Sequence, residues 1–138
     1  EGRNIVDASK LTSKVRIDLQ FGEAAWDGWY TELRSVVDAV GSPFADRIVS
    51  WPYGSNEEFI GSKISGNAGD DDLIGLNGPD QLRGNAGNDV LRAGAGSDTL
   101  RGGAGNDELW GGAGVDSGKG GAGNDVCKSV ERPVSCEA

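Results

Sequence analysis

The sequence predicts an all-β fold in which short parallel strands stack into a solenoid, for three reasons. Glycine supplies 24 of the 138 residues, and 18 of these lie between Gly66 and Lys128. Over that span the sequence repeats every nine residues without a gap, and most units carry an apolar residue at the same position. One short strand cannot bury such a side chain alone, so neighbouring units must stack to form a core.

Residues 1–65 are less regular than the repeats but carry related signals. Apolar and polar residues alternate over Val15–Phe21, which predicts a half-buried strand. The run Gly41–Val49 is a divergent nine-residue unit with aspartate at position six and isoleucine at position eight. We expect residues 1–65 to extend the solenoid and to cap its N-terminal end. A competing prediction is a short helix over Trp26–Val40, because its apolar residues follow helical spacing.

Residues 66–128 form seven consecutive units: GNAGDDDLI, GLNGPDQLR, GNAGNDVLR, AGAGSDTLR, GGAGNDELW, GGAGVDSGK and GGAGNDVCK. Position four is always glycine and position six is always aspartate. The glycines are Gly69, Gly78, Gly87, Gly96, Gly105, Gly114 and Gly123, and the aspartates are Asp71, Asp80, Asp89, Asp98, Asp107, Asp116 and Asp125. Position eight is leucine in the first five units and then becomes Gly118 and Cys127.

This pattern resembles the G-G-x-G-x-D-x-U-x motif of the RTX, or hemolysin-type, calcium-binding repeats. The resemblance covers 63 of the 138 residues. It implies a parallel β-roll, which is a right-handed β-solenoid, and it implies calcium as the bound ion. The seven aspartates are then the candidate metal ligands, together with loop residues of the same units. These loop residues are Gly69, Gly78, Gly87, Gly96, Gly105, Gly114, Asn67 and Asn85.

The spacing of the units also predicts where the carboxylates lie. If alternate units form opposite walls, two units make one turn, and equivalent loops stack about 4.8 Å apart. One edge is then lined by Asp71, Asp89, Asp107 and Asp125, and the other by Asp80, Asp98 and Asp116. Stacked carboxylates repel one another unless a cation lies between them, and Ca²⁺ accepts about six to eight oxygen ligands. One ion for each stacked pair gives about five bridging calcium ions, and the two ends leave room for more.

The C-terminal segment, residues 129–138, reads as a decayed eighth unit. Cys136 follows Cys127 by one nine-residue period, which places it at the inward position, and Val134 replaces the aspartate. We therefore expect this unit not to bind calcium. A disulfide between the two cysteines is typical of an oxidising compartment and predicts a secreted or extracellular protein. Two unpaired thiols in a small apolar cap are the alternative. The cysteine-capped end resembles secreted RTX-like proteins of actinobacteria.

The composition excludes several classes of function. The formal net charge of −9 argues against nucleic acid and anionic membranes as partners, because both favour a basic protein surface. The absence of histidine excludes Ser-His-Asp and Cys-His catalysis and imidazole-ligated zinc or haem. No apolar run reaches the roughly 18 residues of a membrane-spanning helix. We expect no enzyme and no membrane span.

Two groups of side chains offer candidate binding surfaces. One is a basic ladder on one outer wall, formed by Arg83, Arg101 and Lys119. The other is an aromatic cluster, formed by Trp26, Trp29 and Tyr30, which is either core or a carbohydrate platform. We expect the chain to be a calcium-dependent structural module that stabilises or presents an adjoining domain. The alternative is a module that binds an extracellular polysaccharide or cell-wall polymer through one of these groups.

Overall fold

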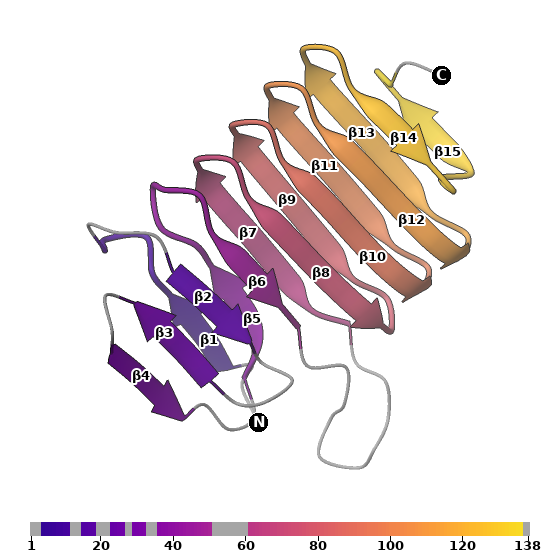
Figure 1. The fold of residues 1–138 in the computed structure, drawn as a ribbon. Helices are drawn as coiled ribbons and strands as arrows, with labels where there is room; N and C mark the ends of the chain where they lie inside the picture. The colour runs from indigo at the N-terminus through magenta and orange to yellow at the C-terminus, as the bar shows by residue number, and fades with distance from the viewer. Residues whose placement is uncertain are drawn as a thin grey trace.

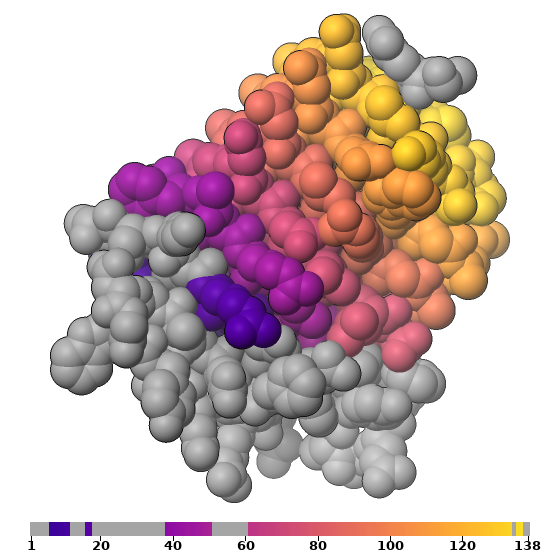
Figure 2. Space-filling view, viewed as in Figure 1, coloured from indigo at the N-terminus to yellow at the C-terminus, as the bar shows by residue number. Residues whose placement is uncertain are grey.

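The computed structural model describes residues 4–11, 15–18, 23–26, 29–32, 36–50 and 61–136. Within these ranges all regular secondary structure is β-strand. The strands form two sheets, which make the two walls of a coil (Figure 1). This confirms the predicted all-β solenoid. Successive turns pack against one another along the molecule (Figure 2). No helix in the described part of the chain is long and apolar enough to cross a bilayer.

One wall, which we name sheet A, has seven strands in the order β1-β5-β7-β9-β11-β13-β15, and every neighbouring pair is parallel. The strands are β1 (Asn4–Asp7), β5 (Val36–Val40), β7 (Lys63–Ala68), β9 (Gln81–Ala86), β11 (Thr99–Ala104), β13 (Ser117–Ala122) and β15 (Arg132–Val134).

The other wall, sheet B, has eight strands in the order β14-β12-β10-β8-β6-β2-β3-β4. It is parallel from β14 to β2 and antiparallel from β2 to β4. The strands are β2 (Val15–Asp18), β3 (Glu23–Trp26), β4 (Trp29–Glu32), β6 (Arg47–Val49), β8 (Asp72–Asn77), β10 (Val90–Gly96), β12 (Glu108–Gly114) and β14 (Val126–Lys128).

The nine-residue period places one apolar side chain per strand in a single column inside each wall. Equivalent leucines, such as Leu73 and Leu91, lie directly beside each other in register. The column of sheet B contains Ile17, Ile48, Leu73, Leu91 and Leu109, and that of sheet A contains Ala39, Ile64, Leu82 and Leu100; none is more than 1% exposed. Burying a leucine in this way stabilises a fold by about 1.5–3 kcal/mol, so the two columns hold the walls together.

The strands before the repeats continue both walls. Ile48 in β6 pairs in register with Leu73, which confirms that Gly41–Val49 is a divergent unit. The strand predicted at Val15–Phe21 is present as β2, and residues 19–22 lie outside the described ranges. The division of the chain into residues 1–65, 66–128 and 129–138 stays a prediction.

The competing prediction of a helix over Trp26–Val40 is wrong. The backbone there forms β3, β4 and β5, and Trp26 is paired with Trp29 in the antiparallel β3–β4 ladder. The physical reason is the adjacent edge of β2: pairing with it gives the backbone of β3 hydrogen-bond partners, and this tertiary context outweighs the helical spacing of the apolar residues. The side chains of the aromatic cluster lie outside the described residues.

The last turn departs from the nine-residue period. Gly118 is in register with Pro133 and Lys119 with Val134, an offset of 15 residues, whereas the preceding pair Leu100 and Gly118 is offset by 18. The prediction that Cys136 holds the inward position and Val134 the aspartate position is therefore wrong. The segment that leads into β15 lacks the glycine-rich loop of a full unit, so the chain returns to sheet A after fewer residues.

Val130 occupies the space that Gly118 leaves in the core. A Cβ atom built on Gly118 would stand 2.9 Å from Cγ1 of Val130 and 3.6 Å from Cδ2 of Leu109. A leucine at position 118 would therefore collide with the valine. The missing core residue of β13 is replaced by a side chain from the connection between β14 and β15.

Cys127 and Cys136 form the predicted disulfide, with their Cα atoms 5.7 Å apart. Cys127 is in register with Leu109 in sheet B and packs against the core, and Cys136 lies just after β15 of sheet A. Because β14 and β15 lie at the C-terminal end of the coil (Figure 1), the bond ties the two walls together there.

Reduction of this disulfide should loosen the last turn and leave the earlier turns folded. The bond closes a loop of about ten residues, which constrains the unfolded chain by roughly 2–3 kcal/mol. Hydrogen exchange with calcium present should become faster in β13–β15 and stay unchanged in β8–β11. The Cys127→Ser/Cys136→Ser double variant should behave like the reduced protein. Equal acceleration in every strand would contradict a local role for the bond.

Candidate metal centre

Each of the seven repeat aspartates is the residue directly before a strand, and none is more than 2% exposed. Because two units make one turn, the strand register stacks the aspartates in two rows. Row 1 precedes the strands of sheet B and contains Asp71, Asp89, Asp107 and Asp125. Row 2 precedes the strands of sheet A and contains Asp80, Asp98 and Asp116. The structure thus brings the predicted carboxylates together as the spacing indicates.

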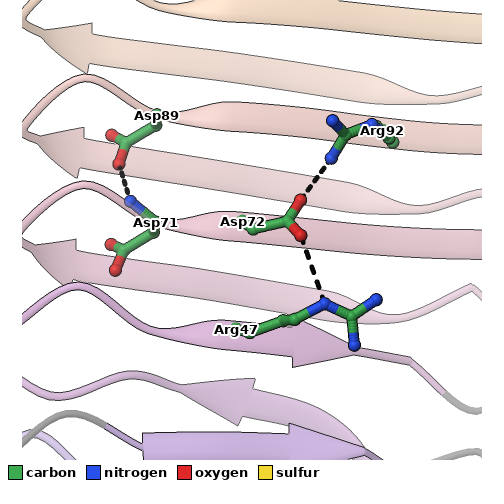
Figure 3. A network of polar contacts seen from close by, with 5 residues as sticks. All are labelled: Arg47, Asp71, Asp72, Asp89 and Arg92. Atoms are coloured by element: carbon green, nitrogen blue, oxygen red, sulfur yellow. Dashed lines mark hydrogen bonds and ion pairs between the residues drawn. The ribbon is translucent and has the colours of Figure 1, made fainter.

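A hydrogen bond from the backbone connects consecutive aspartates of a row. The N–H of Asp71 donates to Oδ1 of Asp89 at 2.8 Å, which Figure 3 shows from close by. The same bond recurs in row 1 at 2.9 and 3.0 Å and in row 2 at 2.7 and 2.9 Å. Each carboxylate is therefore held by the turn that precedes it.

The second carboxylate oxygen, Oδ2, is buried and has no hydrogen-bond partner in six of the aspartates. These are Asp71, Asp89, Asp98, Asp107, Asp116 and Asp125. A buried, unpartnered carboxylate oxygen is costly, and native proteins leave few such atoms. Each of these oxygens requires a proton or a cation, so the residues present fit a metal ion.

In six of the seven units the carboxylate oxygen Oδ2 lies beside a glycine at position one, and the unit of Asp98 has Ala93 there. A Cβ atom on Gly84 would collide with Oδ2 of Asp89 and with the carbonyl oxygen of Gly102 on the next turn. Gly66 and Gly102 meet Oδ2 of Asp71 and Asp107 in the same way. Glycine at position one therefore leaves room for carboxylate and carbonyl oxygens to converge. Oxygen atoms of these two kinds are the ligands that Ca²⁺ prefers.

The backbone conformation of the loops explains the residue types of the candidate loop ligands. Asn67 and Asn85 have φ values of 89° and 82°, in the left-handed region that asparagine and glycine tolerate. Leu76 adopts φ 75° at the same position two, where a leucine is strained. At position four, Gly87 has φ 132° and lies against the carbonyl of Gly69. The assignment of the aspartates, these asparagines and the position-four glycines as calcium ligands stays a prediction.

At the N-terminal end of each row, the first aspartate accepts a hydrogen bond from a residue that precedes the repeats. Asp46 continues row 1, since its N–H donates to Oδ1 of Asp71 at 2.8 Å. Its own carboxylate accepts hydrogen bonds from the N–H and from the hydroxyl of Ser42, the latter at 2.8 Å. In row 2, the N–H of Ser62 donates to Oδ1 of Asp80 at 2.6 Å. Sequence reasoning missed Ser42 and Ser62, although each stands in a loop that leads into a strand.

The environment of the aspartates favours the protonated form when no cation is bound. Burial raises the pKa of Asp71 to about 8 and that of Asp89 and Asp98 to about 6, and it also raises the pKa of Asp107. The backbone hydrogen bond that each receives acts in the opposite direction and is outweighed. Nearby carboxylates, such as Asp107 beside Asp89, add to the increase.

No group of three or more His, Cys, Asp or Glu side chains surrounds a metal position in the described residues. A bound ion would find backbone carbonyl oxygens beside the carboxylates, such as that of Gly102 beside Asp89. This matches the coordination of Ca²⁺, which accepts carbonyl oxygens readily, better than that of zinc, which prefers nitrogen and sulfur.

The family model of the RTX calcium-binding nonapeptide repeat (4 copies) matches residues 65–100 and 93–127. These two matches cover most of β7, all of β8 to β13 and both aspartate rows. No curated protein matches the sequence.

Without calcium, the fold should become less stable as the pH rises. A carboxyl group with a higher pKa in the folded state binds its proton more strongly when folded, so its stabilising effect is complete below the unfolded pKa of about 3.9 and is lost as the pH passes the folded value. That value is about 6 for Asp89 and Asp98 and about 8 for Asp71. Calcium-free protein should therefore keep β-structure and a measurable Tm near about pH 5 and lose both near about pH 8.

Calcium provides the control for this pH dependence. Because Ca²⁺ and protons compete for the same carboxylates, saturating calcium should raise the Tm most at the higher pH. A calcium-free Tm that increases between these two pH values would show that the buried carboxylates do not govern stability.

Proposed function

Because residues 65–127 are RTX calcium-binding nonapeptide repeats, we propose that the chain is a calcium-dependent structural module of a secreted protein. The repeats bind calcium in a β-roll, and the proposed function is that the roll folds and becomes stable when calcium binds. The observation that carries this proposal is the set of buried Oδ2 atoms without hydrogen-bond partners in both rows. Bound calcium would supply the positive charge that these oxygens lack.

The two rows would hold about five bridging ions, one for each stacked pair of aspartates. Five divalent ions carry a charge of about +10, against the formal net charge of −9 of the chain. Calcium binding would thus nearly neutralise the protein. It would also remove the repulsion between carboxylates in neighbouring turns, which opposes folding.

A structural role in an extracellular setting is consistent with the other features of the chain. The Cys127–Cys136 disulfide suits an oxidising compartment. A module that requires calcium stays unfolded at the low calcium concentration inside a cell and folds outside it. We infer a role in stabilising or presenting an adjoining domain, and we assign no enzymatic activity to the chain.

Calcium removal should unfold the roll, and a single row aspartate should control part of the response. Excess chelator should abolish the β-sheet signal in circular dichroism, and calcium should restore it cooperatively because each turn depends on its neighbours. The Asp71→Asn variant should need on the order of tenfold more calcium, because ligand charge sets affinity. A β-sheet spectrum that chelator leaves unchanged would contradict the proposal.

Asp72 provides the matched control. It is adjacent in sequence and carries the same charge, but its carboxylate pairs with Arg47 and Arg92 on the outer wall (Figure 3). Exposed ion pairs of this kind contribute little to stability. The Asp72→Asn variant should therefore keep the calcium midpoint of the unchanged protein. An equal shift of the calcium midpoint in both variants would mean that calcium binding depends only on the overall charge of the protein.

A second candidate function is supported by the difference between the two outer walls. On sheet B, Arg47 and Arg92 pair with Asp72, and Lys128 pairs with Glu108 at 2.9 Å. On sheet A, the basic ladder of Arg83, Arg101 and Lys119 is in register and exposed, and these residues have no ion-pair partner within the described residues. Sheet A thus presents uncompensated positive charge on an acidic protein.

The basic ladder would suit a linear polymer of negative charge. Neighbouring strands place successive cations about 4.8 Å apart along the roll. Lys63 and Arg83, together with Asp38, also line a hollow of about 300 Å³ over β5, β7 and β9. The second candidate is therefore binding of an acidic polysaccharide along sheet A. The aromatic cluster gives no comparable support, because its side chains lie outside the described residues.

Charge neutralisation on the two walls separates this candidate from non-specific attraction. The Arg83→Gln/Arg101→Gln/Lys119→Gln variant should elute from immobilised dextran sulfate at lower salt than the unchanged protein, with calcium present throughout. The matched control, Arg47→Gln/Arg92→Gln/Lys128→Gln, loses the same charge from the paired wall and should elute later than the sheet A variant. Identical elution of the two variants would argue against a site on sheet A.

A further inference from the structure

Row 2 continues beyond its last aspartate through a residue outside the repeat pattern. In that row the N–H of Asp80 donates to Asp98, and the N–H of Asp98 donates to Asp116. The N–H of Asp116 in turn donates to Oε2 of Glu131 at 2.8 Å. Glu131 therefore receives the hydrogen bond that an eighth repeat aspartate would receive.

The register of the last strand explains how a glutamate reaches this place. Asp98 and Asp116 stand directly before β11 and β13, and Glu131 stands directly before β15. Strand β15 pairs with β13 from its first residue, Arg132, opposite Ser117. The residue before the strand is thus stacked on Asp116, even though the connection is three residues shorter than in the repeats.

The carboxylate of Asp116 has a buried oxygen without a hydrogen-bond partner, like the carboxylates inside the roll. Asp116 is fully buried, and its Oδ2 has no hydrogen-bond partner. A Cβ atom on Gly111 would collide with this oxygen and with the carbonyl oxygen of Ser129. Gly84 has the equivalent neighbours, namely Oδ2 of Asp89 and the carbonyl oxygen of Gly102. The terminal loop therefore repeats the oxygen arrangement of an interior one.

We propose that Asp116, Glu131 and the carbonyl oxygen of Ser129 form a terminal calcium site, in addition to the five bridging ions counted from the repeats. This inference rests on the proposed function. The hydrogen bond to Asp116 uses one oxygen of the Glu131 carboxylate, and calcium would engage the carboxylate together with Oδ2 of Asp116. The decayed unit, expected from its sequence not to bind calcium, would then complete a site.

The test compares two charge-neutralising variants of the full chain. Glu131→Gln keeps an oxygen that can accept the N–H of Asp116 but removes the carboxylate charge. The control, Glu108→Gln, removes the same charge from β12, where the side chain pairs with Lys128 on the outer wall. Equilibrium dialysis against calcium chloride counts the bound ions, and hydrogen exchange of β13–β15 reports whether the last turn remains folded.

We expect Glu131→Gln to bind one ion fewer than the unchanged protein, and Glu108→Gln to bind the same number. An unchanged count in Glu131→Gln would overturn the proposal. So would an equal loss in both variants, or a loss accompanied by unfolding of β13–β15, because Glu131 would then act only through charge or as a cap. If the unchanged protein bound no calcium, the proposed function itself would fail together with this inference.

Discussion

The structure depends on one hydrogen bond that recurs along each row, from the N–H of an aspartate to the carboxylate of the aspartate one turn later. This bond fixes the distance between loops and uses one oxygen of every carboxylate. In the six units that begin with glycine, the other oxygen lies beside that glycine, which leaves space for it. The hydrogen bond that stacks neighbouring loops therefore also determines which carboxylate oxygen is left to bind a ligand.

The same arrangement predicts that the fold is sensitive to its solution conditions. The leucine columns supply apolar burial in every turn, but each turn also buries a carboxylate. Burial raises the pKa of several of these groups, and nearby carboxylates add to the increase, because a buried charge without a partner is unfavourable. A cation converts that opposing contribution into a crosslink between neighbouring loops. In the function proposed above, the repeat therefore depends on its ion for stability.

The sequence was sufficient to predict what the nine-residue period controls. Two units per turn, the leucine columns and the two aspartate rows all follow from Gly, Asp and Leu at fixed positions. It was not sufficient where the period breaks. Glu131 acts in place of an aspartate in a shorter connection, and Val130 fills the space beside Gly118 from a different segment. The β3–β4 hairpin was ambiguous because its apolar spacing also suits a helix, and the edge of β2 decides between them.

The two ends of the coil determine how rolls can meet. A parallel sheet that ended on a regular repeat strand would offer a full set of N–H and C=O groups to the first strand of another roll, and rolls could join into fibres. At one end, the edge strand β15 contains Pro133, which has no N–H to donate. At the other, the outermost strands of sheet B run antiparallel to its neighbours. Pro133 therefore weakens strand addition at the sheet A edge of the C-terminal end, whereas β14 of sheet B and β1 of sheet A are ordinary parallel edges of the described strands.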